Sequence, residues 1–249
     1  MFHPPTFYHR LFLDRVSPLL LDIIYALSSR FSEDPGLLST LPADTSVHAR
    51  GEVFAERAHH CARHMVEQRA GWSEEEKRLD RGTWEETEFA QALCLLSVYF
   101  MHLRGSSGNG ASVGSFYLDE GINVLRPTSS ATLSPPASHL GLSIVEYLTL
   151  MEARYRTFWM LVAQDLCASA DGHGRKRRVS EHELYNIPLP GGEAHWVRSG
   201  GAAMGGRETR RRDGMAVGTG NWMGEEGQIG EFGQVLRIVS YNLIGSELS

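Results

Sequence analysis

TWEETEFAQALCLLSVYFMHL, residues 83–103, is the stretch of the chain with the clearest helical signal. Its apolar side chains recur at steps of four, three, four and three residues, which places them on one face of an α-helix. They are Phe89, Leu93, Leu96, Phe100 and Leu103. Thr83 and Glu86 have the spacing of a capping box, in which each side chain satisfies a free backbone N–H group of the other residue. The sequence therefore predicts a helix that begins at Thr83 and ends at the GSSGNG stretch, residues 105–110.

Four more segments are predicted to be helical: residues 17–32, 49–68, 113–125 and the stretch that follows Ser143. The first opens at Ser17 with a proline in the first helical position, where the missing N–H group costs nothing. The last opens at Ser143, and Glu146 completes a second capping box. Strand signals are absent, because no alternating apolar run is followed by a hairpin turn. We therefore expect an all-α, irregular multi-helix domain.

Each of these helices has an apolar face that should point into the core. In residues 17–32 that face consists of Leu20, Ile23, Ile24, Leu27 and Phe31. In residues 49–68 it consists of Phe54, Ala58, Cys61 and Met65. In the last helix it consists of Val145, Leu148, Tyr155, Trp159, Val162 and Leu166, interrupted by Glu152.

Composition and charge exclude some classes of protein. The chain has 249 residues, of which 42% are hydrophobic and 22% charged, so most of it can fold around a core. Its 24 Lys and Arg against 30 Asp and Glu give a net charge of −6, which argues against the whole chain binding a phosphate backbone. No apolar run is long enough to suggest a membrane span, and residues 1–9 do not resemble a secretory signal. We expect a soluble, intracellular protein without a membrane partner.

The cysteines and histidines do not predict a metal site. Cys61, Cys94 and Cys167 lie far apart in apolar, helix-like settings, so we expect three buried, inert thiols. His60 and His64 lie one helical turn apart, but they face away from the apolar stripe of their helix. With Glu56 and Glu67 beside them, we expect a solvated helix face and no metal ligands.

Catalytic motifs are also missing from the sequence. Neither GSSGNG nor GEEGQIGEFG matches a phosphate-binding loop, and no GxSxG elbow occurs. We therefore expect no catalytic, cofactor-binding or metal-ligating residue, and a protein that is not an enzyme. An enzyme with a helical active site is the third alternative.

Two basic clusters are candidate nuclear import signals, with a solvated loop as the alternative interpretation of each. They comprise Arg175, Lys176, Arg177 and Arg178, and Arg207, Arg210, Arg211 and Arg212. The first cluster directly precedes a patterned segment, so we expect it to be tethered to the fold. The second lies in a glycine-rich stretch and is the more accessible candidate.

The composition changes near residue 190. Half of the 26 glycines lie between 191 and 233, whereas all ten prolines lie at or before Pro190. The predicted organisation is one domain over residues 1–197, a flexible Gly/Arg-rich linker over 198–230 and a C-terminal helical segment over 231–249.

Several segments, taken in order, carry a family resemblance. They are FHPPTF near the N-terminus, SPLLLDIIYALSSRFS, ERAHHCARHMVEQ, TEFAQALCLLSVYFMHLRG and EARYRTFWMLVAQDLCASADGHGRKRRVSEHELYNIPLP. Over roughly residues 2–197 they resemble the regulatory, or middle homology, domain of fungal binuclear zinc cluster transcription factors, including the subgroup named for xylanolytic activators. The last segment is the most specific. Its matching residues are Arg154, Arg156, Phe158, Trp159, Asp165, Ser169, Gly174, Arg175, Glu183, Pro188, Leu189 and Pro190.

Two positions depart from the pattern of the family, and one module is missing. Leu166 and Lys176 stand where the family commonly has Arg and Pro. The six-cysteine zinc cluster that reads DNA, which lies upstream in the family, is absent from this chain. We therefore expect zinc only in a missing upstream module, and no cofactor in this chain.

The resemblance implies a nuclear, non-catalytic regulatory domain that modulates RNA polymerase II transcription. Its expected partners are coregulators, and DNA only through the missing or a partner DNA-binding module; a homodimer and a metabolite effector stay open. Arg154 or Arg156 with Asp165 is expected to form structural polar contacts and not a catalytic pair. The alternative function is a free-standing helical module that binds proteins or small ligands without a DNA-linked role.

Overall fold

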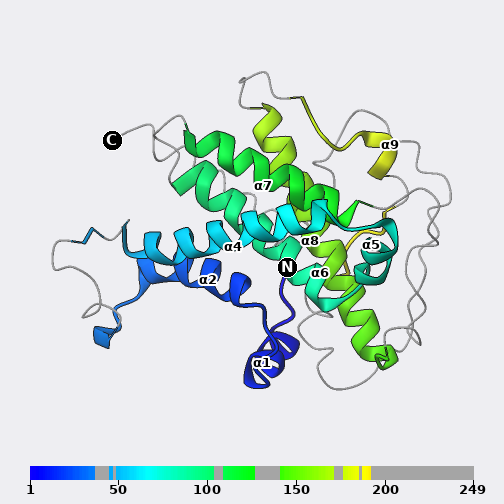
Figure 1. The fold of residues 1–249 in the computed structure, drawn as a ribbon, viewed down its shortest axis with the longest axis horizontal. Helices are drawn as coiled ribbons and strands as arrows, with labels where there is room; N and C mark the ends of the chain where they lie inside the picture. Colours follow the sequence, from blue (N-terminus) through cyan, green and yellow to red (C-terminus); the bar gives the residue numbers. More distant parts are fainter. Residues whose placement is uncertain are drawn as a thin grey trace, which may run out of the picture. The chain divides into compact units, whose positions relative to one another are not determined.

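Helix α6 (Trp84–Val98) lies at the centre of the fold, where it contacts α2, α4, α7 and α8 (Figure 1). Eleven of its fifteen residues are buried, so neighbours cover it on every side and not along one stripe. The predicted inner residues Phe89, Leu93, Leu96 and Phe100 are all buried. The sequence therefore located the central helix and the residues of its inner face.

The computed structural model describes residues 1–36, 45–46, 49–103, 109–126, 141–170, 176–184 and 187–191. All regular structure in these residues is helical, which confirms the predicted all-α fold. The compact unit that they form ends at Gly191. The predicted linker over 198–230 and C-terminal helix over 231–249 lie outside the described residues.

The α-helices of the described residues range from four to 27 residues in length. They are α1 (Pro4–Phe12), α2 (Pro18–Ser28), α4 (Glu52–Ala70), α5 (Glu74–Asp80), α6 (Trp84–Val98), α7 (Asn109–Leu125), α8 (Ile144–Ala170) and α9 (Glu181–Leu184). Short 3-10 turns extend α2 over Ser29–Phe31 and precede α4 over Ala49–Gly51, and a π-turn follows α6 over Tyr99–Leu103. Of these helices, α1, α5 and α9 were not predicted.

The capping box predicted for α6 forms only in part. Thr83 accepts a hydrogen bond from the Glu86 N–H at 3.1 Å, as predicted. The Glu86 carboxylate instead accepts from the Gly82 N–H at 2.7 Å and takes arginine partners from other helices. The capping box at Ser143 and Glu146, in contrast, forms completely at the start of α8.

Small residues bring α2 and α4 together, which corrects the predicted inner face of α4. The buried residues of α4 are Ala55, Ala58 and Ala62, whereas Cys61 is exposed. A Cβ atom on Gly51, just before α4, would lie 2.0 Å from the carbonyl oxygen of Ala26 in α2. This close approach favours alanines over the larger side chains that the apolar pattern selected. In the same region Phe31 is 86% exposed, so it does not belong to the predicted inner face of α2.

The predicted inner face of α8 is wrong in its phase. Val145 and Leu166 are 56% and 51% exposed, and of the six residues predicted to be buried only Val162 is. The helix buries Leu150, Ala153, Thr157, Leu161 and Asp165, which follow one another at steps of three or four. Charged side chains on the buried face caused the error, because a hydrophobic pattern assigns them to solvent.

Helix α7 begins four residues before the predicted start at residue 113 and packs closely against its neighbours. A Cβ atom on Gly114 would lie 2.3 Å from the Met101 side chain, and one on Gly121 would lie 2.9 Å from Leu161 of α8. These glycines let α7 lie directly on α8 and on the end of α6. Within the described residues, no helix is both long and apolar enough to cross a membrane.

Candidate functional site

The residues that follow α8 run back along it in the opposite direction. Near the end of α8, the buried Asp165 carboxylate accepts hydrogen bonds from the N–H groups of Arg178 at 2.7 Å and Val179 at 3.2 Å. Six residues earlier on α8, the indole N–H of Trp159 donates to the carbonyl oxygen of Pro188 at 2.9 Å. We call residues 176–184 and 187–191 the docked segment.

An ion pair on α8 holds the end of the docked segment. Arg156 and Glu152 lie one turn apart, both are buried, and the Arg156 Nε donates to the Glu152 Oε1 at 3.0 Å. The Gly191 N–H donates to the same carboxylate oxygen at 2.7 Å, and the Gly191 carbonyl accepts from Arg156 at 2.6 Å. Backbone groups of the docked segment thus hydrogen-bond to both members of the buried ion pair. These bonds offset the free-energy cost of removing the two charges from water.

Of the residues that carry the family resemblance, Arg156, Trp159 and Asp165 of α8 contact the docked segment, whereas Arg154 and Asp165 do not contact each other. They lie eleven positions apart on α8, which is roughly 16 Å along a helix. Arg154 pairs with Glu86 of α6. Phe158 is buried in the core, Pro188 is exposed and Pro190 is half-buried. Gly174 and Arg175 lie outside the described residues.

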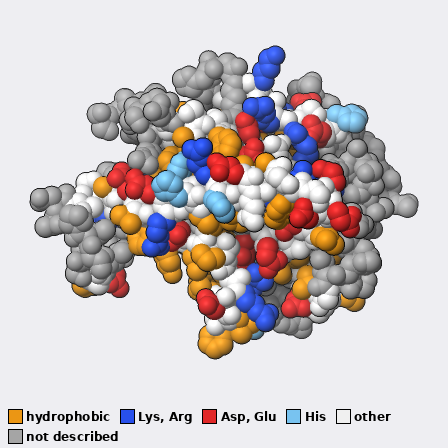
Figure 2. All heavy atoms as spheres, in the orientation of Figure 1, with side chains coloured by type: hydrophobic (Ala, Val, Ile, Leu, Met, Phe, Trp, Pro, Cys, Tyr) orange, Lys and Arg blue, Asp and Glu red, His pale blue; other side chains and the backbone are white. Residues whose placement is uncertain are grey.

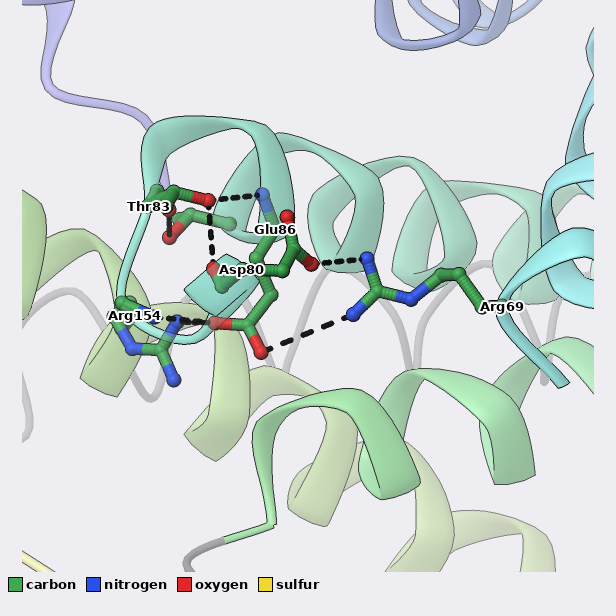
Figure 3. Close-up of polar contacts among 7 residues, drawn as sticks. Arg69, Asp80, Thr83, Glu86 and Arg154 are labelled. Carbon is green, nitrogen blue, oxygen red and sulfur yellow. Dashed lines mark hydrogen bonds and ion pairs between the residues drawn. The ribbon is translucent and has the colours of Figure 1, made fainter. Parts of the chain in front are cut away.

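Glu86 connects four helices through charged contacts (Figure 3). Its side chain is buried and pairs with Arg154 of α8, and its second oxygen lies 3.9 Å from Arg69 of α4. Arg69 in turn pairs with Asp80 at the end of α5. Sequence reasoning identified Glu86 only as a cap, because its arginine partners lie far away in the chain and nothing local predicts them.

A second buried carboxylate attaches α1 to α6. Glu88 accepts from the Arg10 Nε at 2.9 Å and from the Ser17 N–H at 2.8 Å. Burial raises the pKa of Glu88 even though both hydrogen bonds and the Arg10 charge oppose this shift. The Arg10 guanidinium also lies over the Trp84 ring, 5.0 Å from its centroid.

A surface hollow of about 500 Å³ opens beside this contact. It is lined by Arg10, Arg15, Thr83, Trp84, Glu85 and Leu142. On α1 next to it, Tyr8 and Phe12 are 67% and 86% exposed, and hydrophobic side chains are visible on the surface over this helix (Figure 2). Arg10 of α1 therefore both lines the hollow and pairs with Glu88.

The first basic cluster is tethered to the fold, as the sequence predicted. Arg178 is exposed, donates to Asp119 of α7 at 2.7 Å, and has its backbone N–H bound to Asp165. Arg177 is half-buried and lies 3.9 Å from Glu181, and Lys176 is exposed. Arg175 and the whole second cluster (Arg207, Arg210, Arg211 and Arg212) lie outside the described residues.

The cysteines differ from the prediction of three buried thiols. Cys94 is buried, but Cys167 is half-buried and Cys61 is exposed. Burial raises the pKa of the Cys94 thiol to about 12, so this group is protonated and a weak nucleophile at neutral pH. Gln164 of α8 donates to its sulfur at 3.1 Å, which makes it part of the contact between α6 and α8.

The histidine-rich face of α4 is exposed, as predicted: Glu56, His60, His64 and Glu67 all lie at the surface. In the part of the chain that the structure describes, no three His, Cys, Asp or Glu side chains are placed to hold a metal ion together. The neighbouring His59 points inward, where its Nδ1 lies 2.7 Å from the Tyr117 hydroxyl. Its role as a packing residue was not predicted.

Comparisons with protein-family models, with curated proteins and with solved structures found no match for this chain. The fold class therefore rests on the helices described above.

Proposed function

We propose that this chain is a non-catalytic regulatory domain of a fungal transcription factor, which modulates RNA polymerase II transcription in the nucleus. DNA contact would belong to a zinc cluster module outside these 249 residues or to a partner that carries one. The net charge of −6 supports this division, because a protein that binds a phosphate backbone needs a basic surface.

The observation that carries the proposal is the set of structural contacts made by the residues that carry the family resemblance. Arg154, Arg156, Trp159 and Asp165 each bond to another helix or to the docked segment. These bonds fix how the helices and the docked segment pack. Such a structural role suits a domain that acts by binding other proteins. The hollow beside α1 and the exposed Phe12 offer such a contact surface.

The test is to fuse the full chain to a heterologous DNA-binding domain and to measure a reporter gene in a fungal cell. We expect reporter output to differ several-fold from that of the DNA-binding domain alone. Glu86→Ala should abolish the effect by destabilising the helical body, whereas Glu67→Ala on the exposed face of α4, away from the hollow, should preserve it. Unchanged output with the wild-type chain, at equal nuclear protein level, would contradict the proposal.

The second candidate is a free-standing helical module that binds proteins or small ligands without a DNA-linked role, and the surface hollow favours it. Cellular location separates the two candidates. A fluorescent fusion of the full chain should accumulate in the nucleus if the domain regulates transcription. A cytosolic fusion whose reporter effect is also absent would favour the free-standing module.

A further inference from the structure

Ser180 lies in a sequence context that no part of the proposed function uses. It follows Arg177, Arg178 and Val179, and it is the only serine or threonine of the 249 residues with arginines both two and three positions before it. Serine kinases directed by arginine bind two such guanidinium groups with carboxylates in their substrate groove, because arginine and carboxylate pair strongly. The positions of the two arginines therefore determine which serine such a kinase phosphorylates.

The structure leaves this serine accessible. Ser180 is exposed, and residues 176–180 are not helical, so the main chain can adopt the extended form that a kinase groove needs. Two contacts oppose that change: the Val179 side chain is fully buried, and the Asp165 carboxylate holds the N–H groups of Arg178 and Val179. A kinase must therefore release Val179 before it can act.

We propose that Ser180 is a phosphorylation site of an arginine-directed serine kinase. The γ-phosphoryl group of Mg-ATP is transferred to the Ser180 Oγ, which forms one P–O bond and breaks the bond between the γ-phosphorus and the bridging oxygen. The hydroxyl proton passes to the catalytic carboxylate of the kinase, and ADP leaves. The proposal does not depend on a role in transcription.

The contacts around Ser180 show what the phosphate would change. The Ser180 hydroxyl donates to the Glu183 Oε1 at 3.0 Å, and the Ser180 N–H donates to the same oxygen at 3.3 Å. The other oxygen of Glu183 pairs with the Arg126 Nε at 3.0 Å. A phosphate carries roughly −1.5 to −2 charges at neutral pH, so it repels Glu183 and competes for Arg126. Phosphorylation therefore weakens the pairing of Glu183 with Arg126, the residue that follows α7, and the turn of α9 opens.

The experiment treats the full chain with Mg-ATP and the catalytic subunit of cyclic-AMP-dependent protein kinase, followed by intact mass and peptide mapping. We expect one phosphate at Ser180 and at least a tenfold lower uptake in Ser180→Ala. The matched control is Ser240→Ala, because Ser240 has an arginine only three positions before it. No phosphate on the folded wild-type chain, or equal uptake in Ser180→Ala, would overturn the proposal.

Two further measurements test the release of Val179 and the opening of α9. Val179→Ala keeps both arginines but weakens the anchor, so it should raise the initial rate of phosphorylation several-fold. On the phosphorylated chain, the backbone amides of residues 180–184 should exchange with deuterium at least tenfold faster. An unchanged rate in Val179→Ala would contradict the required release of the anchor, and unchanged amide exchange would contradict the opening of α9.

Discussion

Glu86 of α6 joins this helix to both α4 and α8. One carboxylate at the start of α6 holds the Gly82 N–H, Arg154 of α8 and Arg69 of α4. Its side chain is 2% exposed, so these partners replace water. Breaking a buried pair from one side leaves a charge without its partner, which costs far more than losing a surface pair.

We therefore expect Glu86→Ala to lower the free energy of unfolding by about 3–5 kcal/mol. Urea denaturation followed by circular dichroism measures this change. The exposed neighbour Glu85→Ala is the control, and it should change stability by less than about 0.5 kcal/mol. A loss below about 1 kcal/mol in Glu86→Ala would show that the buried charges contribute little.

Asp14 is a second residue with a specific conformational demand. It has a φ of 55°, and it follows α1 at the position where helices commonly end in a glycine. The Arg15 N–H bonds the Arg10 carbonyl at 2.9 Å and the Asp14 N–H bonds the Leu11 carbonyl at 3.0 Å, which is the Schellman pattern. This left-handed turn directs the chain from α1 into α2.

Two substitutions at this turn should have opposite effects. Asp14→Val should lower the free energy of unfolding by about 1–2 kcal/mol, because a β-branched residue is strained at positive φ. Asp14→Gly should leave stability unchanged or raise it slightly, since glycine adopts this conformation without strain. Thermal melts of both variants check the order, and a glycine variant less stable than the valine variant would refute it.

Individual contacts of this kind could not be predicted from the sequence. The spacing of Thr83 and Glu86 indicated a helix start, but the partners of Glu86 lie in other helices. Cys61 was assigned to the core because cysteine is often buried, whereas the buried residues of α4 are Ala55, Ala58 and Ala62 and Cys61 is exposed.

At the scale of the element, two helix starts form a natural comparison. Ser143 precedes α8, and its hydroxyl and backbone N–H both bond the Glu146 carboxylate, while its oxygen accepts from the Glu146 N–H. Ser17 precedes α2 but makes no side-chain capping hydrogen bond. The hydrogen bonds from Ser143 lower the pKa of Glu146.

Ser143→Ala should cost about 1 kcal/mol, whereas Ser17→Ala should cost almost nothing. In the Ser143 variant the pKa of Glu146 should return towards its usual range, which NMR titration can follow. A depressed carboxyl pKa stabilises the fold above the pKa of the unfolded chain, and this contribution is lost as the pH falls through the folded value. Equal losses in the two variants would contradict the assignment of the caps.

The docked segment provides the second test at this scale. Asp165→Ala leaves the N–H groups of Arg178 and Val179 without their acceptor. We expect the exchange of these two amides with deuterium to accelerate at least tenfold, while the amides of α2 stay unchanged. Leu166→Ala, at an exposed position one residue further, should have no such effect. Unchanged protection of residues 178–179 in Asp165→Ala would contradict the role of Asp165.

Helices of different kinds differed in how well the sequence predicted them. Long helices with an apolar pattern, such as α2 and α6, were located within a few residues. Helix α5 has the sequence EEEKRLD, which contains one apolar side chain, so no hydrophobic period could reveal it. The position of α8 was predicted but its inner face was not, because Glu152 and Asp165 are buried.

At the scale of the whole molecule, the buried helix α6 separates two parts of the core. Phe89 and Leu93 of α6 pack with residues of α2 and α4, while Ala90 and Cys94 pack with residues of α7 and α8. Val179 and Ile187 of the docked segment complete the second part. We infer that α6 organises a helical body whose buried charges hold it together.

Hydrogen–deuterium exchange of the full chain, resolved by residue, tests this claim most directly. The amides of residues 89–97 in α6 should exchange slowest among the described helices, because they open only when the whole body unfolds. The amides of the short, exposed helix α1 should exchange orders of magnitude faster. Exchange in residues 89–97 as fast as in α1 would contradict the central position of α6 in the helical body.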